Sequence, residues 1–192
     1  MKKYLSLVAV VILFGTAGVF AQVTASDSIT VTATNQGIFS FNIADASYAF
    51  GTVNANGAAN VGGTDALTGT PFAGGATYTA SAASTWSAQS APARTVRIFN
   101  ASTTSVIGWG TADRLAMGIP SSNQGGTSCG LVAFGTTGDG LSACANGNLI
   151  HGVAVGNGAN DADGDLDFQL TVDDTDAAGS NTWTVVLTAA GA

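Results

Sequence analysis

The stretch Ser28–Val53, SITVTATNQGIFSFNIADASYAFGTV, decides the fold that we expect for this chain. Ile29, Val31 and Ala33 alternate with polar residues, and alternation with a period of two indicates a β-strand with one apolar face. Asn35-Gln36-Gly37 then predicts a turn, because glycine adopts positive φ at little steric cost. The chain is therefore expected to begin with a strand and to reverse.

A second strand is expected directly after this turn. Phe39, Phe41 and Ile43 share one face, and Ser40 and Asn42 occupy the other. After a turn at Asp45–Ser47, the segment SYAFGTV is expected to bring Tyr48 and Phe50 beside that apolar face. The opening stretch has no basic residue and supplies much of the expected core.

Residues 1–21 have the pattern of a secretory signal peptide. Lys2 and Lys3 precede an apolar run from Leu5 to Phe14, and Val19-Phe20-Ala21 fits a cleavage site. The apolar run is too short for a membrane span. We expect export by the general secretory route, a mature chain that begins at Gln22, no membrane insertion after cleavage, and an extracellular or cell-surface location.

The charge of residues 22–192 excludes some partners. Three arginines stand against twelve aspartates, which leaves a formal net charge of −9. Such a surface repels nucleic acid and anionic membranes, because binding to phosphate needs clustered Lys or Arg. The chain has no Glu, and its two Lys lie in the signal peptide, so two good helix formers are missing.

The rest of the chain alternates between short strand patterns and loops rich in Gly, Ala and Thr. Strands are expected at residues 77–86, 94–99, 106–109, 131–134, 149–155, 166–172 and 183–187. Residues 54–77 are expected to be a long surface loop, with room for one short strand, and residues 156–167 a second loop. Turns are expected at Asn100–Thr104 and 138–140, and a helical turn at Asp113–Met117. About nine short strands at this spacing predict one all-β domain over residues 22–192, a β-sandwich of immunoglobulin-like or jelly-roll-like type.

The two cysteines, Cys129 and Cys144, are expected to form a disulfide, because exported proteins fold in an oxidising compartment. The alternative is a metal site with His151 as the third ligand. Exported thiols rarely stay reduced, and the spacing matches no zinc pattern.

Catalysis is not expected. His151 is the single histidine and lies in register with apolar neighbours, and no Gly-x-Ser-x-Gly motif is present. The aspartates lie in expected turns rather than in apolar surroundings that would raise a carboxyl pKa. We therefore expect a non-enzymatic protein without an obligatory cofactor.

Two groups of residues suggest ligands, and each has a simpler interpretation. Asp161, Asp163, Asp165 and Asp167 alternate around Gly164 and offer oxygen ligands for calcium, although the order departs from an EF-hand; the simpler interpretation is a solvated acidic turn. Trp86, Trp109 and Trp183 could form a carbohydrate platform, but their strand-like settings favour burial in the core.

The segment Gln22–Thr34 suggests assembly. It is strand-like and lacks the Lys and Pro that normally protect a sheet edge. Ile29, Val31 and Ala33 could therefore add to the sheet of a neighbouring subunit, as in donor-strand complementation. The alternative is an ordinary first strand within its own sheet.

Three stretches resemble a known group of proteins: residues 29–57, residues 93–103 (ARTVRIFNAST), and residues 166–191 (LDFQLTVDDTDAAGSNTWTVVLTAAG). Their order, the Phe50-Gly51 step and the final strand–turn–strand resemble bacterial secreted β-sandwich surface proteins of the pilin-like, spore-coat-U-like and WxL-like kinds. The chain lacks the WxL signature, the spore-coat-U cysteine pattern and the aromatic residue near the pilin C-terminus. The resemblance implies an extracellular structural role.

Two functions of different classes follow. The first is a structural subunit of an extracellular filament or surface layer that polymerises with itself by strand complementation. The second is a monomeric secreted module that binds carbohydrate or cell wall, with calcium at the Asp161–Asp167 segment.

Overall fold

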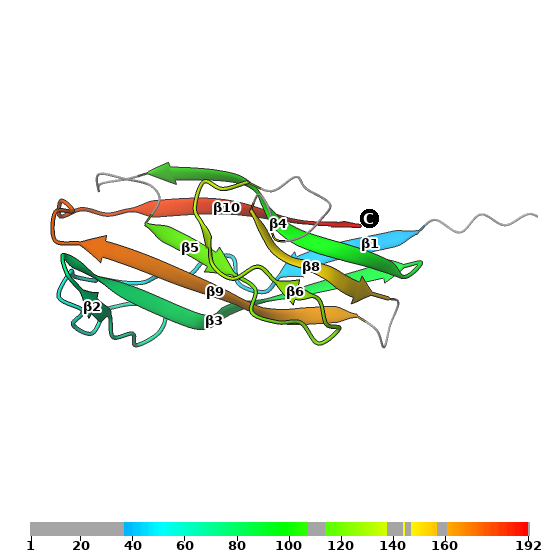
Figure 1. Ribbon diagram of the computed structural model, residues 1–192, viewed down its shortest axis with the longest axis horizontal. Helices are drawn as coiled ribbons and strands as arrows, with labels where there is room; N and C mark the ends of the chain where they lie inside the picture. Colours follow the sequence, from blue (N-terminus) through cyan, green and yellow to red (C-terminus); the bar gives the residue numbers. More distant parts are fainter. Residues whose placement is uncertain (1–36, 107–113, 138–143, 145–146, 157–160, 192) are drawn as a thin grey trace, which may run out of the picture. The chain divides into compact units, whose positions relative to one another are not determined.

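Two antiparallel sheets make up the described part of the chain, which in this computed structural model covers residues 37–106, 114–137, 144, 147–156 and 161–191 (Figure 1). Within these residues the chain forms strands, turns and loops but no helix. The strands are β1 (Ile38–Ile43), β2 (Thr70–Phe72), β3 (Gly75–Ala91), β4 (Arg94–Val106), β5 (Leu115–Gly118), β6 (Thr127–Ser128), β7 (Val132–Ala133), β8 (Asn148–Val155), β9 (Ala162–Asp173) and β10 (Thr182–Gly191). The prediction of an all-β, sandwich-like fold is confirmed.

The strand order separates the chain into two layers. The larger sheet has the order β1-β3-β9-β5-β7, with β2 paired to β3, and the smaller sheet has the order β10-β4-β8-β6. The long consecutive strands β3 and β4 belong to different sheets, so the chain crosses between the layers at Pro92. Proline suits this position because it cannot donate a backbone hydrogen bond to continue a ladder.

Strand β3 follows the alternation expected from its sequence, but over a longer range. Buried Tyr78, Ala80, Trp86 and Ala88 alternate with exposed residues across its seventeen positions. A bulge between Ala80 and Ser84 contains Ala82 at φ 52° and keeps the inner row in phase on both sides. One strand can therefore serve both ends of the core.

The core lies between the sheets. Its main cluster centres on Trp86, Ile98, Met117, Leu149 and Ile150, each no more than 1% exposed. A smaller cluster of Ala76, Tyr78, Leu170 and Val172 lies at one end of β3 and β9. Burial of Trp86 is the interpretation that the sequence favoured for this tryptophan, and it is confirmed.

Several local predictions were wrong. Asp113–Met117 was expected to form a helical turn, but Leu115–Gly118 is strand β5, paired with β9 and β7. Leu, Ala and Met favour helices by propensity, whereas here alternate burial of Leu115 and Met117 and two pairing partners determine a strand. Asn100–Thr104 was expected to turn, but these residues continue β4, because β10 supplies a partner for this part of the strand.

Residues 156–167 were expected to form an acidic loop, but β9 begins at Ala162. The segment SYAFGTV, which was expected to bring Tyr48 and Phe50 beside the apolar face of β1, contributes an isolated bridge between Thr52 and Val61. The expected strand end at residues 107–109 and the turn at residues 138–140 lie outside the described residues.

The loop after β1 is held by two side chains. The Asn60 amide donates to the carbonyl oxygens of Phe50 (2.7 Å) and Asp65 (2.9 Å) and accepts from the Leu67 N–H (2.8 Å). The hydroxyl of fully buried Tyr78 lies 2.9 and 2.8 Å from the carbonyl oxygens of Asn54 and Ala58 and accepts from the Asn54 N–H (3.3 Å). Because a hydroxyl has one proton, the two carbonyls share it.

Replacing Tyr78 with Phe is expected to lower the free energy of unfolding by about 1–3 kcal/mol, because the loop then loses its buried polar partner. Tyr48→Phe is the matched control: its hydroxyl donates to the carboxylate of exposed Asp65 (2.9 Å), which water can solvate after the change, so its loss should cost less than about 1 kcal/mol. Urea unfolding of both variants measures the difference. Equal losses would contradict the assigned role of Tyr78.

Candidate functional site

The free edges of β1 and β10 lie on the same side of the two sheets, which we call the open side. Among the described residues, β1 pairs only with β3, and β10 pairs only with β4. A Cβ built on Gly37, just before β1, would lie 3.7 Å from an Arg94 guanidinium nitrogen. A Cβ atom built on Gly191, at the end of β10, would lie 3.4 Å from Cδ of the same arginine. The start of β1 and the end of β10 therefore meet at Arg94 (Figure 1).

Strands β1 and β10 of the open side lack the usual protection of sheet edges. Neither IFSFNI in β1 nor TWTVVLTAAG in β10 contains a charged residue or proline, and β10 is ten residues long. Charged residues, proline and short length are the devices that prevent edge strands from pairing with other chains. The open side is thus an edge that can accept a further strand.

Apolar side chains are left partly uncovered along the open side. Trp183, Val185 and Leu187 of β10 and Phe41 of β1 pack against the main core but stay partly exposed. On outward-facing positions, Ile38 is 61% exposed and Val186 is 49% exposed. An added strand with apolar residues at every second position would continue the inner row of β10.

The opposite edges of the sheets are protected. They are formed by β6 and β7, which have two residues each. Very short edge strands offer few backbone groups to a partner. The contrast between the two sides makes the open side the candidate interaction site.

The predicted interface residues Ile29, Val31 and Ala33 lie outside the described residues. The segment that contains them joins the described chain at Gly37, at the Arg94 end of the open side. The predicted signal peptide, residues 1–21, also lies outside the described residues.

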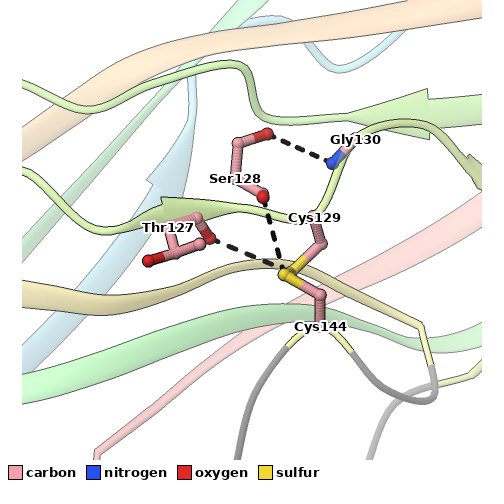
Figure 2. The surroundings of a disulfide bond; sticks show 5 residues. All are labelled: Thr127, Ser128, Cys129, Gly130 and Cys144. Atoms are coloured by element: carbon pink, nitrogen blue, oxygen red, sulfur yellow. Dashed lines mark hydrogen bonds between the residues drawn. A yellow bond between two sulfur atoms is a disulfide. The ribbon is translucent and has the colours of Figure 1, made fainter.

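The predicted disulfide is present between Cys129 and Cys144, whose Cα atoms are 4.8 Å apart, within the usual range (Figure 2). Cys129 follows β6, and its backbone N–H donates to the Leu149 carbonyl oxygen of β8 (2.9 Å). His151 of β8 pairs with Thr127 of β6 and is half-buried. Its ring nitrogen and the two sulfur atoms all lie within 4.8 Å of one another.

The four aspartates of the predicted calcium site lie just before β9 (Asp161) and along it (Asp163, Asp165 and Asp167) instead of around a loop. A strand rises about 3.3 Å per residue, so Asp161 and Asp167 are separated by about 20 Å of extended chain. The Asp161 carboxylate accepts from the Gln89 amide (3.0 Å), Asp163 from the Asn123 amide (2.7 Å), and Asp167 from the Ala82 N–H (2.8 Å). Within the described residues these carboxylates do not form a group of three or more that could hold one ion. Calcium binding stays a prediction without support from their placement.

The three tryptophans have different settings. Trp86 is 1% exposed in the core, Trp183 is half-buried with its ring 6.5 Å from that of Phe134, and Trp109 lies outside the described residues. Trp86 therefore presents no face to a sugar ring. It does, however, underlie a shallow depression of about 250 Å³ on the outer face of the larger sheet, which is lined by Asn42, Thr85, Ser87, Asp163 and Asp165.

The Tyr48 phenol in the loop after β1 donates a hydrogen bond to the Asp65 carboxylate. Partial burial, and then the hydrogen bond to the Asp65 carboxylate, raises the pKa of the Tyr48 phenol above its ordinary value. A phenol that is harder to ionise keeps its proton at neutral pH and holds the loop, which is a structural role. The prediction of a non-enzymatic protein stays untested.

Sequence reasoning missed the β10 edge. The absence of Lys and Pro that singled out Gln22–Thr34 applies equally to Trp183–Ala190. What the sequence did not reveal was that β10 ends its sheet, because strand order depends on long-range pairing. The described residues also contain no helix long and apolar enough to cross a membrane.

Comparisons with protein-family models, with curated proteins and with solved structures found no match to this chain.

Replacing both cysteines with serine is expected to lower the free energy of unfolding by about 3 kcal/mol, because a cross-link of this span restricts the unfolded chain. Urea unfolding of the Cys129→Ser/Cys144→Ser variant, of the oxidised wild-type protein and of the reduced wild-type protein measures this loss of unfolding free energy. The reduced protein serves as the control for the substitutions themselves. If the urea midpoints of the double variant and of the reduced wild-type protein both equalled that of the oxidised protein, the cross-link would have no stabilising role.

Proposed function

We propose that this protein is a structural subunit of an extracellular bacterial filament or surface layer, assembled by β-strand complementation between copies. The observation that carries the proposal is the open side, where two uncharged edge strands are available, one of them ten residues long. The start of β1 and the end of β10 meet there at Arg94. Residues 29–33 of one copy would add to β10 of the next.

The backbone of β10 supports this pairing. A strand with only one neighbour leaves alternate N–H and C=O groups pointing away from its sheet, where an extended chain can pair with them. Ten residues provide a ladder longer than an average strand of about five or six residues. Hydrogen bonds of this kind give affinity without requiring a particular sequence.

The side chains support the same partner. Ile29, Val31 and Ala33 recur at every second position, as do the half-covered Trp183, Val185 and Leu187 of β10. Pairing the two strands would place two apolar rows side by side over the core. Burial of apolar surface contributes about 25 cal/mol per Å², so covering this row stabilises the contact. Neither strand contains a charge that would have to be desolvated.

The donor segment and the acceptor edge of one copy can serve two different neighbours. The donor segment leaves the described chain at Gly37 beside Arg94, the end of the open side where β10 also finishes. A copy that donates its own segment to a neighbour still offers its β10 edge to another. Donor and acceptor differ, so the contact is heterologous and can repeat into a polymer.

Val186→Lys is expected to abolish or strongly reduce polymers of the mature protein, because a lysine on the edge strand disfavours strand addition. Val61→Lys is the matched control: Val61 is also an exposed valine, but it lies in the loop after β1, where its backbone pairs with Thr52 rather than with an edge of either sheet. Light scattering and electron microscopy of both variants measure assembly. Equal assembly of the two variants would refute β10 as the acceptor.

The second candidate function is a secreted module that binds carbohydrate or cell wall. The depression lined by Asn42, Thr85, Ser87, Asp163 and Asp165 favours it, because hydroxyl, amide and carboxylate groups can bind sugar hydroxyls. The contact between Asp163 and Asn123 is structural, since Asn123 also accepts from the Asp163 N–H (2.9 Å). Asp165 is the exposed carboxylate to test.

For this second function, Asp165→Asn is expected to weaken binding to cell-wall polysaccharide by at least about fivefold, with or without added calcium, through loss of a charged hydrogen-bond acceptor. Asp174→Asn, on the turn after β9, is the control for a general loss of negative charge. Pull-down with insoluble polysaccharide measures the binding of the wild-type protein and of both variants. Absence of binding by the wild-type protein would exclude this function.

A further inference from the structure

We propose that Cys129, Cys144 and His151 form a binding site for a thiophilic cation, with Zn²⁺ as the representative case, once a thiol reductant has opened the disulfide. The observation is the mutual placement of the three side chains, whose ligand atoms all lie within 4.8 Å of one another. This site is independent of the open side and of strand exchange.

Two of the ligands are positioned by backbone pairing rather than by the disulfide. His151 lies on β8 opposite Thr127 of β6, and Cys129 is fixed to β8 by its hydrogen bond to the Leu149 carbonyl oxygen. Both contacts are independent of the S–S bond and can persist after its reduction. Cys144 is the third ligand, brought to the pair by the cross-link (Figure 2).

The ligand set suits zinc. Zinc binds thiolate sulfur at about 2.3 Å and imidazole nitrogen at about 2.0–2.1 Å in tetrahedral sites, so the ligand atoms of a formed site are roughly 3.5–3.8 Å apart. From the observed limit of 4.8 Å the imidazole nitrogen has to approach the sulfurs by about 1 Å, whereas the two sulfurs, which are bonded in the disulfide, have to separate; side-chain rotation can supply both movements. Two cysteines and one histidine leave a fourth position for water.

The chemistry balances with a thiol reductant. Two molecules of a small thiol are oxidised to their disulfide, and the Cys129–Cys144 bond takes up the two electrons and two protons to give two thiols. Binding of Zn²⁺ then releases two protons from these thiols, because the thiolate is the metal ligand. Metal and disulfide exclude each other, so the redox state controls binding.

The disulfide is accessible to a small reductant. Cys144 is exposed and Cys129 is half-buried, so a thiolate can approach the bond. The sulfur of Cys144 lies 3.5 Å from the Ser128 carbonyl oxygen, and that of Cys129 lies 3.9 Å from the Thr127 carbonyl oxygen (Figure 2). A disulfide sulfur has no hydrogen, so these contacts become S–H hydrogen bonds only in the dithiol, which they would stabilise.

Zinc titration of the mature protein tests the site. Protein reduced with a phosphine and kept free of oxygen is expected to bind one Zn²⁺ per chain by calorimetry, whereas the oxidised protein binds none. Co²⁺ used as a spectroscopic probe is expected to give a thiolate-to-metal absorption band in the reduced protein only. His151→Ala should weaken the affinity for Zn²⁺ by at least about tenfold, and Cys129→Ser/Cys144→Ser should abolish the Co²⁺ band.

Circular dichroism of the reduced protein separates a folded site from binding by an unfolded chain. If reduction unfolds the protein, Zn²⁺ is expected to restore the β spectrum of the wild-type chain but not of His151→Ala. Absence of binding by the reduced protein would overturn the proposal. Equal affinity of wild-type and His151→Ala proteins would overturn it as well, because two cysteines alone would then account for the metal.

Discussion

The packing of Trp86 against Gly164 is the contact on which the arrangement of the two sheets depends. Trp86 lies on β3 and pairs with Gly164 of β9; a Cβ on Gly164 would come within 3.0 Å of the indole nitrogen and 2.4 Å of the Ser121 carbonyl oxygen. Glycine therefore leaves room beside β9 for the indole of Trp86, the largest fully buried side chain. Strand β3 is paired to β9 along most of its length, and the chain then crosses to the smaller sheet at Pro92 and continues as β4. That crossing brings the outer neighbours of β3 and β4, which are β1 and β10, to the same side.

The difference between the two sides follows from this connection. On one side the sheets end in β6 and β7, two residues each, next to a disulfide and a histidine. On the other side they end in longer strands without charge, where apolar residues of the core are only half covered. A folded protein that is stable alone normally protects such edges. An edge that is kept open by the fold is most simply explained as an edge that is filled by another strand, which is the physical basis of the proposed assembly.

The sequence predicted the fold class well and the sites less well, for identifiable reasons. Alternation in Phe39–Ile43 and Tyr78–Trp86, together with the absence of Glu, was sufficient to predict sheets, because these signals are local. The predictions for Leu115–Gly118 and Asn100–Thr104 were wrong. Pairing of the first segment with β9 and of the second with β10 overrides the helix and turn propensities of their residues. The aspartates were expected to lie together in a loop around Gly164. Because β9 starts at Ala162, three of them instead lie along an extended strand. The proximity of His151 to the two sulfurs arises from the pairing of β6 with β8, which no spacing in the sequence reveals.

The central claim, that copies of this protein join by exchange of the segment before β1, is tested most directly by electron microscopy of the mature protein beside a variant that lacks Gln22–Thr34. The account predicts filaments or ordered layers from the intact mature chain and discrete particles from the truncated one. It also predicts that the truncated protein, with both its β1 and β10 edges available, binds a synthetic peptide of residues 22–36. Discrete particles from both proteins, with no binding of the peptide, would contradict the account.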